Sequence, residues 1–365
     1  MAQQCENGIL ADHEIEALFS AGAIAAPRSL DDDQIQPASL DLRLGETAYR
    51  VRAGFMPGKA HAVSAKLDRY ELHRIDLTGG AVLETGCVYV VPLLEALALP
   101  DDLAASANPK SSTGRLDIFT RVIADQAVEF DHVPPGYAGP LYLEISPRTF
   151  PIVVRTGSRL SQIRFRRGQA MLDAAELRAL HAAETLVADD APSIAESGVA
   201  LSVDLSGDGE GLVGYRGKRH TGLVDVDKPA AHDVLDFWEP VRVRDRAELI
   251  LDPDEFYILV SRQAVHVPPL YAAEMTPFDP LVGEFRVHYA GFFDPGFGHW
   301  AAGGMGSRAV LEVRSHEVPF VLEDGQIVGR LVYERMAARP RALYGAELKS
   351  NYQAQGLKLS KHFRA

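Results

Sequence analysis

Residues 110–115 gather two positive charges, three hydroxyls and a glycine within six positions. Lys110 would supply a point charge and Arg115 a planar fork of donors. The small residues between them allow backbone N–H groups to approach a ligand closely. This combination predicts a binding site for an anion. A polar surface turn has a similar composition, so these residues alone leave both interpretations open.

Glu144 is the second candidate for chemistry. It lies among alternating apolar residues at positions 141–145, where a carboxylate is costly to bury unless it is paired. Burial would raise its pKa toward the range that suits a general base and acid. Alternatively, a half-buried strand would simply direct Glu144 toward solvent.

The segments around these residues are short strand-like runs separated by glycine, proline and aspartate. Many short strands at regular spacing are typical of a barrel or a sandwich. Residues 171–187 are instead rich in alanine and leucine and are predicted to be helical, and residues 189–193 have the composition of a linker. The sequence therefore predicts a mainly β protein with a few short helices.

The two strand-rich halves resemble each other. Three pairs of residues recur in order at one offset of 168 positions: Tyr89 and Tyr257, Pro100 and Pro268, Glu144 and Glu312. One such coincidence would mean little, whereas three in order indicate a tandem duplication. We expect a first unit at 1–168, a helical connector at 169–199, a second unit at 200–336 and a C-terminal tail at 337–365.

Composition restricts the classes of function. The 365 residues include 37 Lys and Arg against 50 Asp and Glu, a formal net charge of −13. This acidic total argues against a partner such as nucleic acid or an anionic membrane, but not against a local basic pocket. With only Cys5 and Cys87 and no familiar ligand spacing, a zinc site is not expected. No signal peptide or membrane span is recognisable, and we expect a cytoplasmic protein.

Residues 37–45, 111–116, 136–139 and 157–162 form an ordered set of motifs. This set resembles the motifs of the dCTP deaminase family, which belongs to the trimeric dUTPase superfamily. The resemblance covers about residues 1–168 and returns near the C-terminus at Tyr344, Tyr352, Gln355 and Gly356. It implies two tandem dUTPase-like barrels of β-clip or jelly-roll type, the first with intact motifs and the second degenerate, followed by a nucleotide-covering tail.

The resemblance also implies roles for individual residues in binding. The triphosphate, together with Mg²⁺ held through it, would be bound by Lys110, Ser111, Ser112, Thr113, Gly114 and Arg115. Asp131 would bind the deoxyribose 3′-hydroxyl, and Tyr142 and Leu143 would line the sugar and base. Tyr344, Lys349 and Gln355 would belong to the covering tail.

The catalytic set implied by the resemblance is Glu144, Ser111, Arg115 and Ala124. Glu144 would take a proton from the water that attacks C4 of cytosine and would then deliver protons toward the departing ammonia. Ser111 and the carbonyl of Ala124 would position that water. This chemistry needs no zinc, in contrast to base deaminases that surround their glutamate with His and Cys ligands.

The second half keeps Glu312, but the positions that correspond to the cradle, residues 278–283, hold an aspartate and an apolar run. Such residues are not suited to a triphosphate. The second half is then either a structural repeat, or a donor of Glu312 to a cradle supplied by a first half.

These observations predict a hydrolase that converts dCTP to dUTP and ammonia. The alternatives are a bifunctional deaminase and dUTP pyrophosphatase, a dUTPase, and a non-catalytic nucleotide-binding regulator. The resemblance further suggests dTTP as an inhibitor and a homo-oligomer, either a trimer or a pseudo-symmetric assembly in which two halves imitate two subunits.

Overall fold

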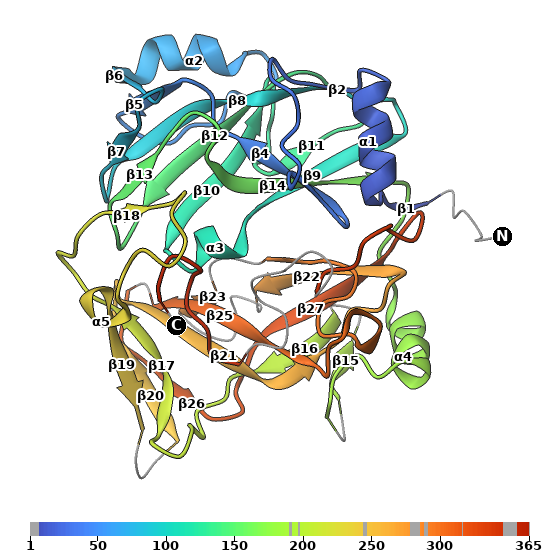
Figure 1. Cartoon of the computed structure of the whole chain (residues 1–365), viewed down its shortest axis with the longest axis vertical. Helices are drawn as coiled ribbons and strands as arrows, with labels where there is room; N and C mark the ends of the chain where they lie inside the picture. The colour runs from blue at the N-terminus through green and yellow to red at the C-terminus, as the bar shows by residue number, and fades with distance from the viewer. Residues whose placement is uncertain are drawn as a thin grey trace.

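A computed structural model describes the chain at residues 7–189, 192–195, 198–243, 247–277, 285–287, 291–315, 317–345 and 356–364. The first half, blue to green in Figure 1, and the second half, yellow to red, lie one above the other along the longest axis. The predicted replacement for the cradle at 278–283, and Lys349 and Gln355 of the tail, lie outside the described residues.

Two antiparallel sheets form most of the first half, and β7 and β13 form a third, three-stranded sheet with β18 of the second half. One sheet has the order β11-β9-β14-β4-β3, with β1 paired to β14, and the other has the order β10-β12-β8-β5-β6, with β2 paired to β8. The strands are β1 Gly8–Ile9, β2 Ile24–Ala25, β3 Ile35–Gln36, β4 Ser39–Arg43, β5 Thr47–Val51, β6 Glu71–Asp76, β7 Ala81–Leu83, β8 Val88–Ala98, β9 Leu103–Pro109, β10 Ile118–Ala124, β11 His132–Val133, β12 Ala138–Pro147, β13 Ile152–Val154 and β14 Arg159–Arg167.

The second half repeats this plan. Its sheets have the orders β15-β16-β27-β22-β24 and β19-β17-β21-β25-β23, with β20 and β26 forming a separate pair. The strands are β15 Ile194–Ala195, β16 Gly198–Ser202, β17 Leu212–Gly217, β18 Val224–Asp225, β19 Trp238–Arg242, β20 Glu248–Leu251, β21 Phe256–Val265, β22 Tyr271–Pro277, β23 Phe285–Val287, β24 Phe292–Phe293, β25 Ser307–Ser315, β26 Phe320–Glu323 and β27 Ile327–Arg335.

The helices are few and short. They are α1 Asp12–Ser20, α2 Val63–Tyr70, α3 Ser111–Gly114, α4 Ala174–Ala183, α5 Val234–Phe237 and the 3₁₀ turn η2 Trp300–Ala302. Helix α4 lies within the segment 171–187 that composition predicts to be helical, and Asp173 caps it by accepting a hydrogen bond from the N–H of Glu176. The prediction of a mainly β protein is confirmed. Within the described residues, no helix combines the length and apolar character needed to cross a bilayer.

The offset of 168 positions relates whole strands. Adding it to β9 gives the bounds of β22, and adding it to β14 gives those of β27. The central pairing of β12 with β8 is likewise repeated by β25 with β21. Because equivalent strands have equivalent neighbours, Glu144 on β12 and Glu312 on β25 occupy matching places in the two halves.

The two halves differ in what covers the sheet face that carries these glutamates. In the first half, α2 and the chain before it cover this face, and Val63 and Leu67 of α2 pack with Val90, Ile123 and Tyr142 of the sheet. In the second half, Ile258 and Val310 of the equivalent face belong to the apolar core of the first half. The glutamate face of the second half therefore packs against the first half, whereas that of the first half is covered by its own helix.

Candidate active site

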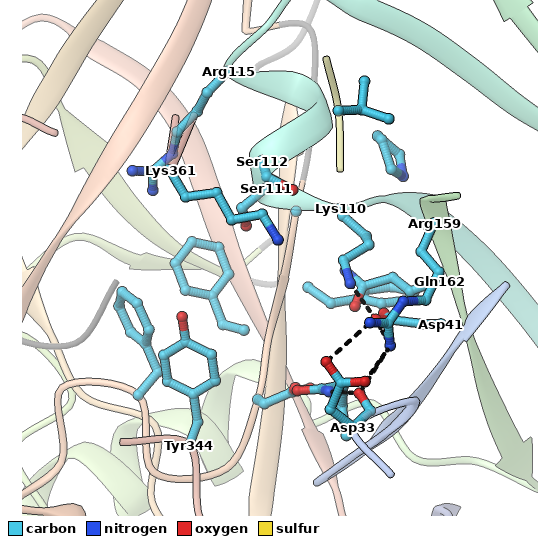
Figure 2. Close-up of a pocket in the computed structure, with 18 of the residues that line it drawn as sticks. Asp33, Asp41, Lys110, Ser111, Ser112, Arg115, Arg159, Gln162, Tyr344 and Lys361 are labelled. Atoms are coloured by element: carbon cyan, nitrogen blue, oxygen red, sulfur yellow. Dashed lines mark hydrogen bonds and ion pairs between the residues drawn. The ribbon is translucent and has the colours of Figure 1, made fainter. Parts of the chain in front are cut away.

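A cavity of about 460 Å³ lies at the boundary between the halves. The first half lines it with Lys110, Ser111, Ser112, Arg115 and Arg159, and the second half with Phe292, Asp294, Phe297, Glu312 and Tyr344. Figure 2 shows Tyr344 on one side of the cavity, and Lys110, Arg159 and Asp33 on the other. The cavity thus has a charged wall and an aromatic wall.

The predicted cradle is a single helical turn, α3, at the end of β9. The N–H of Lys110 donates to the carbonyl of Leu160 (3.0 Å), and the N–H of Thr113 donates back to the carbonyl of Lys110 (2.8 Å). This places Lys110, Ser111 and Ser112 on the cavity wall. Thr113 and Gly114 are buried behind it and do not line the cavity, so their part is to form the turn.

The cations of the charged wall already face carboxylates. Lys110 forms an ion pair with Asp41, and Arg159 lies 2.9 Å from Asp33 and 3.6 Å from Asp41. A hydrogen bond from Arg159 lowers the pKa of Asp33. Sequence reasoning did not select Arg159, although it belongs to the motif at 157–162.

Glu312 faces this cradle from β25. Its Oε1 lies 3.9 Å from Nε of Arg115, and the side chain is only 5% exposed. Burial raises the pKa of Glu312 to about 8, although the positive charge of Arg115 opposes that rise. A carboxyl group with a pKa near neutrality can both accept and deliver a proton.

The raised pKa makes stability depend on pH. Because the pKa of about 8 lies above the ordinary value of 4.5, the folded protein binds more protons than the unfolded chain between these values. The free energy of unfolding contributed by Glu312 therefore falls as the pH rises from about 4.5 to about 8. We expect the melting temperature of ligand-free E312Q to fall less steeply over this range than that of the unmodified protein. Parallel melting curves would contradict the raised pKa.

Glu144, the predicted general base, does not line this cavity. Arg121 stands directly opposite it in the ladder between β10 and β12 and donates to Glu144 Oε1 from Nε (3.0 Å) and Nη2 (2.5 Å). Gly54 lies in the loop between β5 and α2. A Cβ atom added at Gly54 would lie 2.5 Å from Oε2 of Glu144, so this loop covers the carboxylate. The geometry gives no support to Glu144 as the partner of the cradle.

The remaining predicted residues of the first half lie near Glu144. Ala124, Tyr142 and Leu143 are buried in β10 and β12, and none of them lines the cavity. Asp131 accepts a hydrogen bond from the N–H of Val122 (2.7 Å), and burial raises its pKa to about 7. The structure therefore separates the predicted set into a cradle at the cavity and a second group on and beside the paired strands β10 and β12.

Asp294 supplies a second buried carboxylate to the cavity. Its Oδ1 lies 3.1 Å from Nη2 of Arg164, which is fully buried and lies 4.0 Å above the ring of Phe292. Burial raises the pKa of Asp294, and Arg164 opposes that rise. The arrangement offers a fixed acceptor beside aromatic side chains, which suits a ligand that combines a ring with hydroxyl groups.

Comparison with known protein families agrees with a nucleotide site. Residues 6–169 match the family model of the 2′-deoxycytidine 5′-triphosphate deaminase N-terminal domain. Residues 173–363 match that of the C-terminal domain of the same family. The two matches together span both halves.

Individual relatives point the same way. A "dCTP deaminase, dUMP-forming" of Beutenbergia cavernae is 32% identical over 161 residues, 43% of this chain and 78% of the relative. A "dCTP deaminase" of Haloarcula marismortui is 33% identical over 160 residues, 43% of this chain and 79% of the relative. The crystal structure of 2′-deoxycytidine 5′-triphosphate deaminase from Agrobacterium tumefaciens is 71% identical, covers 94% of this chain and 100% of its own, and superposes with a TM-score of 0.90. The chain therefore belongs to the 2′-deoxycytidine 5′-triphosphate deaminase family, whose members are hydrolases that act on a carbon–nitrogen bond.

Proposed function

We propose that this protein hydrolyses dCTP to dUTP and ammonia in the cavity between its two halves. The observation that carries the proposal is the position of Glu312, a buried carboxyl group opposite Arg115 and the turn that holds Ser111 and Ser112. The family and the relatives' names give the substrate class.

Glu312 would act as both general base and general acid, the part that the sequence suggested for Glu144. It accepts a proton from water as the water oxygen bonds to C4 of the cytosine ring. Protons then pass to the ring nitrogen and the amino group, and the carbon–nitrogen bond breaks to release ammonia. A pKa near 8 suits this exchange because the group changes its protonation state at little cost near neutral pH. The proposal uses no zinc ion.

The charged wall would hold the triphosphate. Lys110 and Arg159 are at present paired with Asp41 and Asp33, and phosphate oxygens would share these cations. Among the described residues, no group of three or more His, Cys, Asp or Glu side chains is arranged to hold a metal ion. We therefore propose that Mg²⁺ enters with the triphosphate and is held through it, where it neutralises phosphate charge.

The sugar and base would lie against the aromatic wall. Asp294 would accept a hydrogen bond from a deoxyribose hydroxyl, the part suggested for Asp131; this assignment is supported by the position of Asp294 on the cavity wall, which Asp131 does not share. Phe292, Phe297 and Tyr344 provide apolar surface for the ring.

Incubation with dCTP and Mg²⁺, followed by measurement of ammonia, dUTP, dUMP and pyrophosphate, tests the proposal. We expect ammonia to form in step with the loss of dCTP, with dUTP as the product. Absence of ammonia would reject deaminase activity.

A bifunctional reaction is the second candidate, because the Beutenbergia cavernae relative is named dUMP-forming. In that case the same assay would yield ammonia, dUMP and pyrophosphate in equal amounts. Pyrophosphate without ammonia would indicate a dUTPase-like activity instead.

A further inference from the structure

The C-terminal segment, residues 356–364, is built onto the cradle itself. The carbonyl of Lys358 accepts a hydrogen bond from Nη1 of Arg115 (2.9 Å), and the hydroxyl of Ser360 donates to the carbonyl of Ser112 (2.9 Å). In Figure 1 the end of the chain lies at the boundary between the halves, beside α3. Lys361, which follows directly, lines the cavity.

The chain on the C-terminal side of Lys361 is also held in place. Nε2 of His362 lies 2.8 Å from the carbonyl of Val226, and the ring of Phe363 packs against Phe237 with centroids 5.4 Å apart. Both side chains are buried. Because these contacts hold the chain on each side of Lys361, the fold sets the point from which its side chain extends.

The side chain of Lys361 points into the cavity. In Figure 2 the side chain of Lys361 extends between Arg115 and Lys110 toward the open space in front of Ser111. Burial lowers the pKa of Lys361, as does the charge of Lys110, while Asp41 opposes the effect. An anion placed between Lys361, Lys110 and Arg115 would interact favourably with all three positive charges.

We propose that Lys361 binds the phosphate chain of the nucleotide, as a cation that the C-terminal segment supplies to the cradle. The inference rests on the proposed function, since it names a further binding residue of the same cavity. In this proposal, the segment at 356–364 positions Lys361, because Ser360, His362 and Phe363 hold the chain around it against the turn of α3 and the second half.

The test uses the full-length protein with two ligands, dCTP and inorganic tripolyphosphate. K361M keeps most of the side-chain length but removes the charge, K361R keeps the charge, and K59M removes an exposed lysine that does not line the cavity. We expect K361M to raise the KM for dCTP and the inhibition constant of tripolyphosphate by roughly 10- to 100-fold, the usual loss for a hydrogen bond to a charged group. The value of kcat should change little, and K361R and K59M should behave like the unmodified protein.

Melting temperatures show whether each variant is folded. If folded K361M binds both ligands as tightly as K59M does while deaminating dCTP, the role of Lys361 is rejected and the proposed function stands. If the unmodified protein neither deaminates dCTP nor binds tripolyphosphate, both proposals fail together.

Discussion

Replacement of Glu312 with Gln is expected to lower kcat for ammonia release by roughly 10²- to 10⁴-fold, the usual contribution of a positioned acid–base group. The amide keeps the size of the side chain but cannot take the proton from water. The substitution also removes a buried carboxyl group whose pKa is raised by burial. Folded E312Q should therefore be at least as stable as the unmodified protein at neutral pH. Affinity for dCTP, measured by calorimetry with the inactive variant, should survive.

The matched control is E144Q, the same change at the equivalent position of the first half. Glu144 is bound by Arg121 and closed over by the loop at Gly54, so its amide variant should lose some stability but keep its activity per folded molecule. Full activity of E312Q, or loss of catalysis in folded E144Q, would return the general base to Glu144.

The sequence predicts much of the architecture because duplication leaves local traces. Strand-like runs at a constant offset of 168 reproduce the bounds of β22 and β27 from those of β9 and β14. The anion cradle is also predictable, since its cations and small residues lie within one turn of the chain. Both features can be recognised within short, continuous stretches of sequence.

Neighbours in sequence do not show which of the two glutamates faces the anion cradle. Glu144 and Glu312 have similar strand contexts, and what distinguishes them is the cover of each sheet face. Helix α2 covers one, and the first half covers the other. Arg121 opposes Glu144 only in the register of β10 with β12. From the sequence, Glu312 was a possible partner for the cradle of a first half, because the second half lacks a recognisable cradle of its own.

Residues that act across the boundary were missed for the same reason. Arg164 lies within a strand-like run, and its partner Asp294 is 130 positions away. Lys361 reaches the cavity only because the chain end returns to α3. The available sign for Arg164 was a charged residue between two apolar ones, Ile163 and Phe165. No local pattern marks Lys361.

R164M is expected to destabilise the protein by about 3–5 kcal/mol, the usual cost of removing one member of a buried ion pair. Arg164 is fully buried, lies 3.1 Å from Asp294 and 3.6 Å from Glu334, and donates to the carbonyl of Ala273 (3.2 Å). Methionine fills part of the space but leaves the carboxylates without that charge. Urea unfolding gives the free energy, and R28M, which removes one side of an exposed pair with Glu46, should cost less than about 1 kcal/mol.

The pH dependence of that loss separates the ion pair from simple packing. Without Arg164 the buried Asp294 is unfavourable only while it is ionised, so protonation relieves the cost. The deficit of R164M relative to the unmodified protein should therefore shrink as the pH is lowered from 8 to 5. For the same reason D294N should rescue part of the loss, making the double variant more stable than the sum of the single effects. A deficit that does not change with pH and adds to that of D294N would mean that Arg164 acts through packing alone.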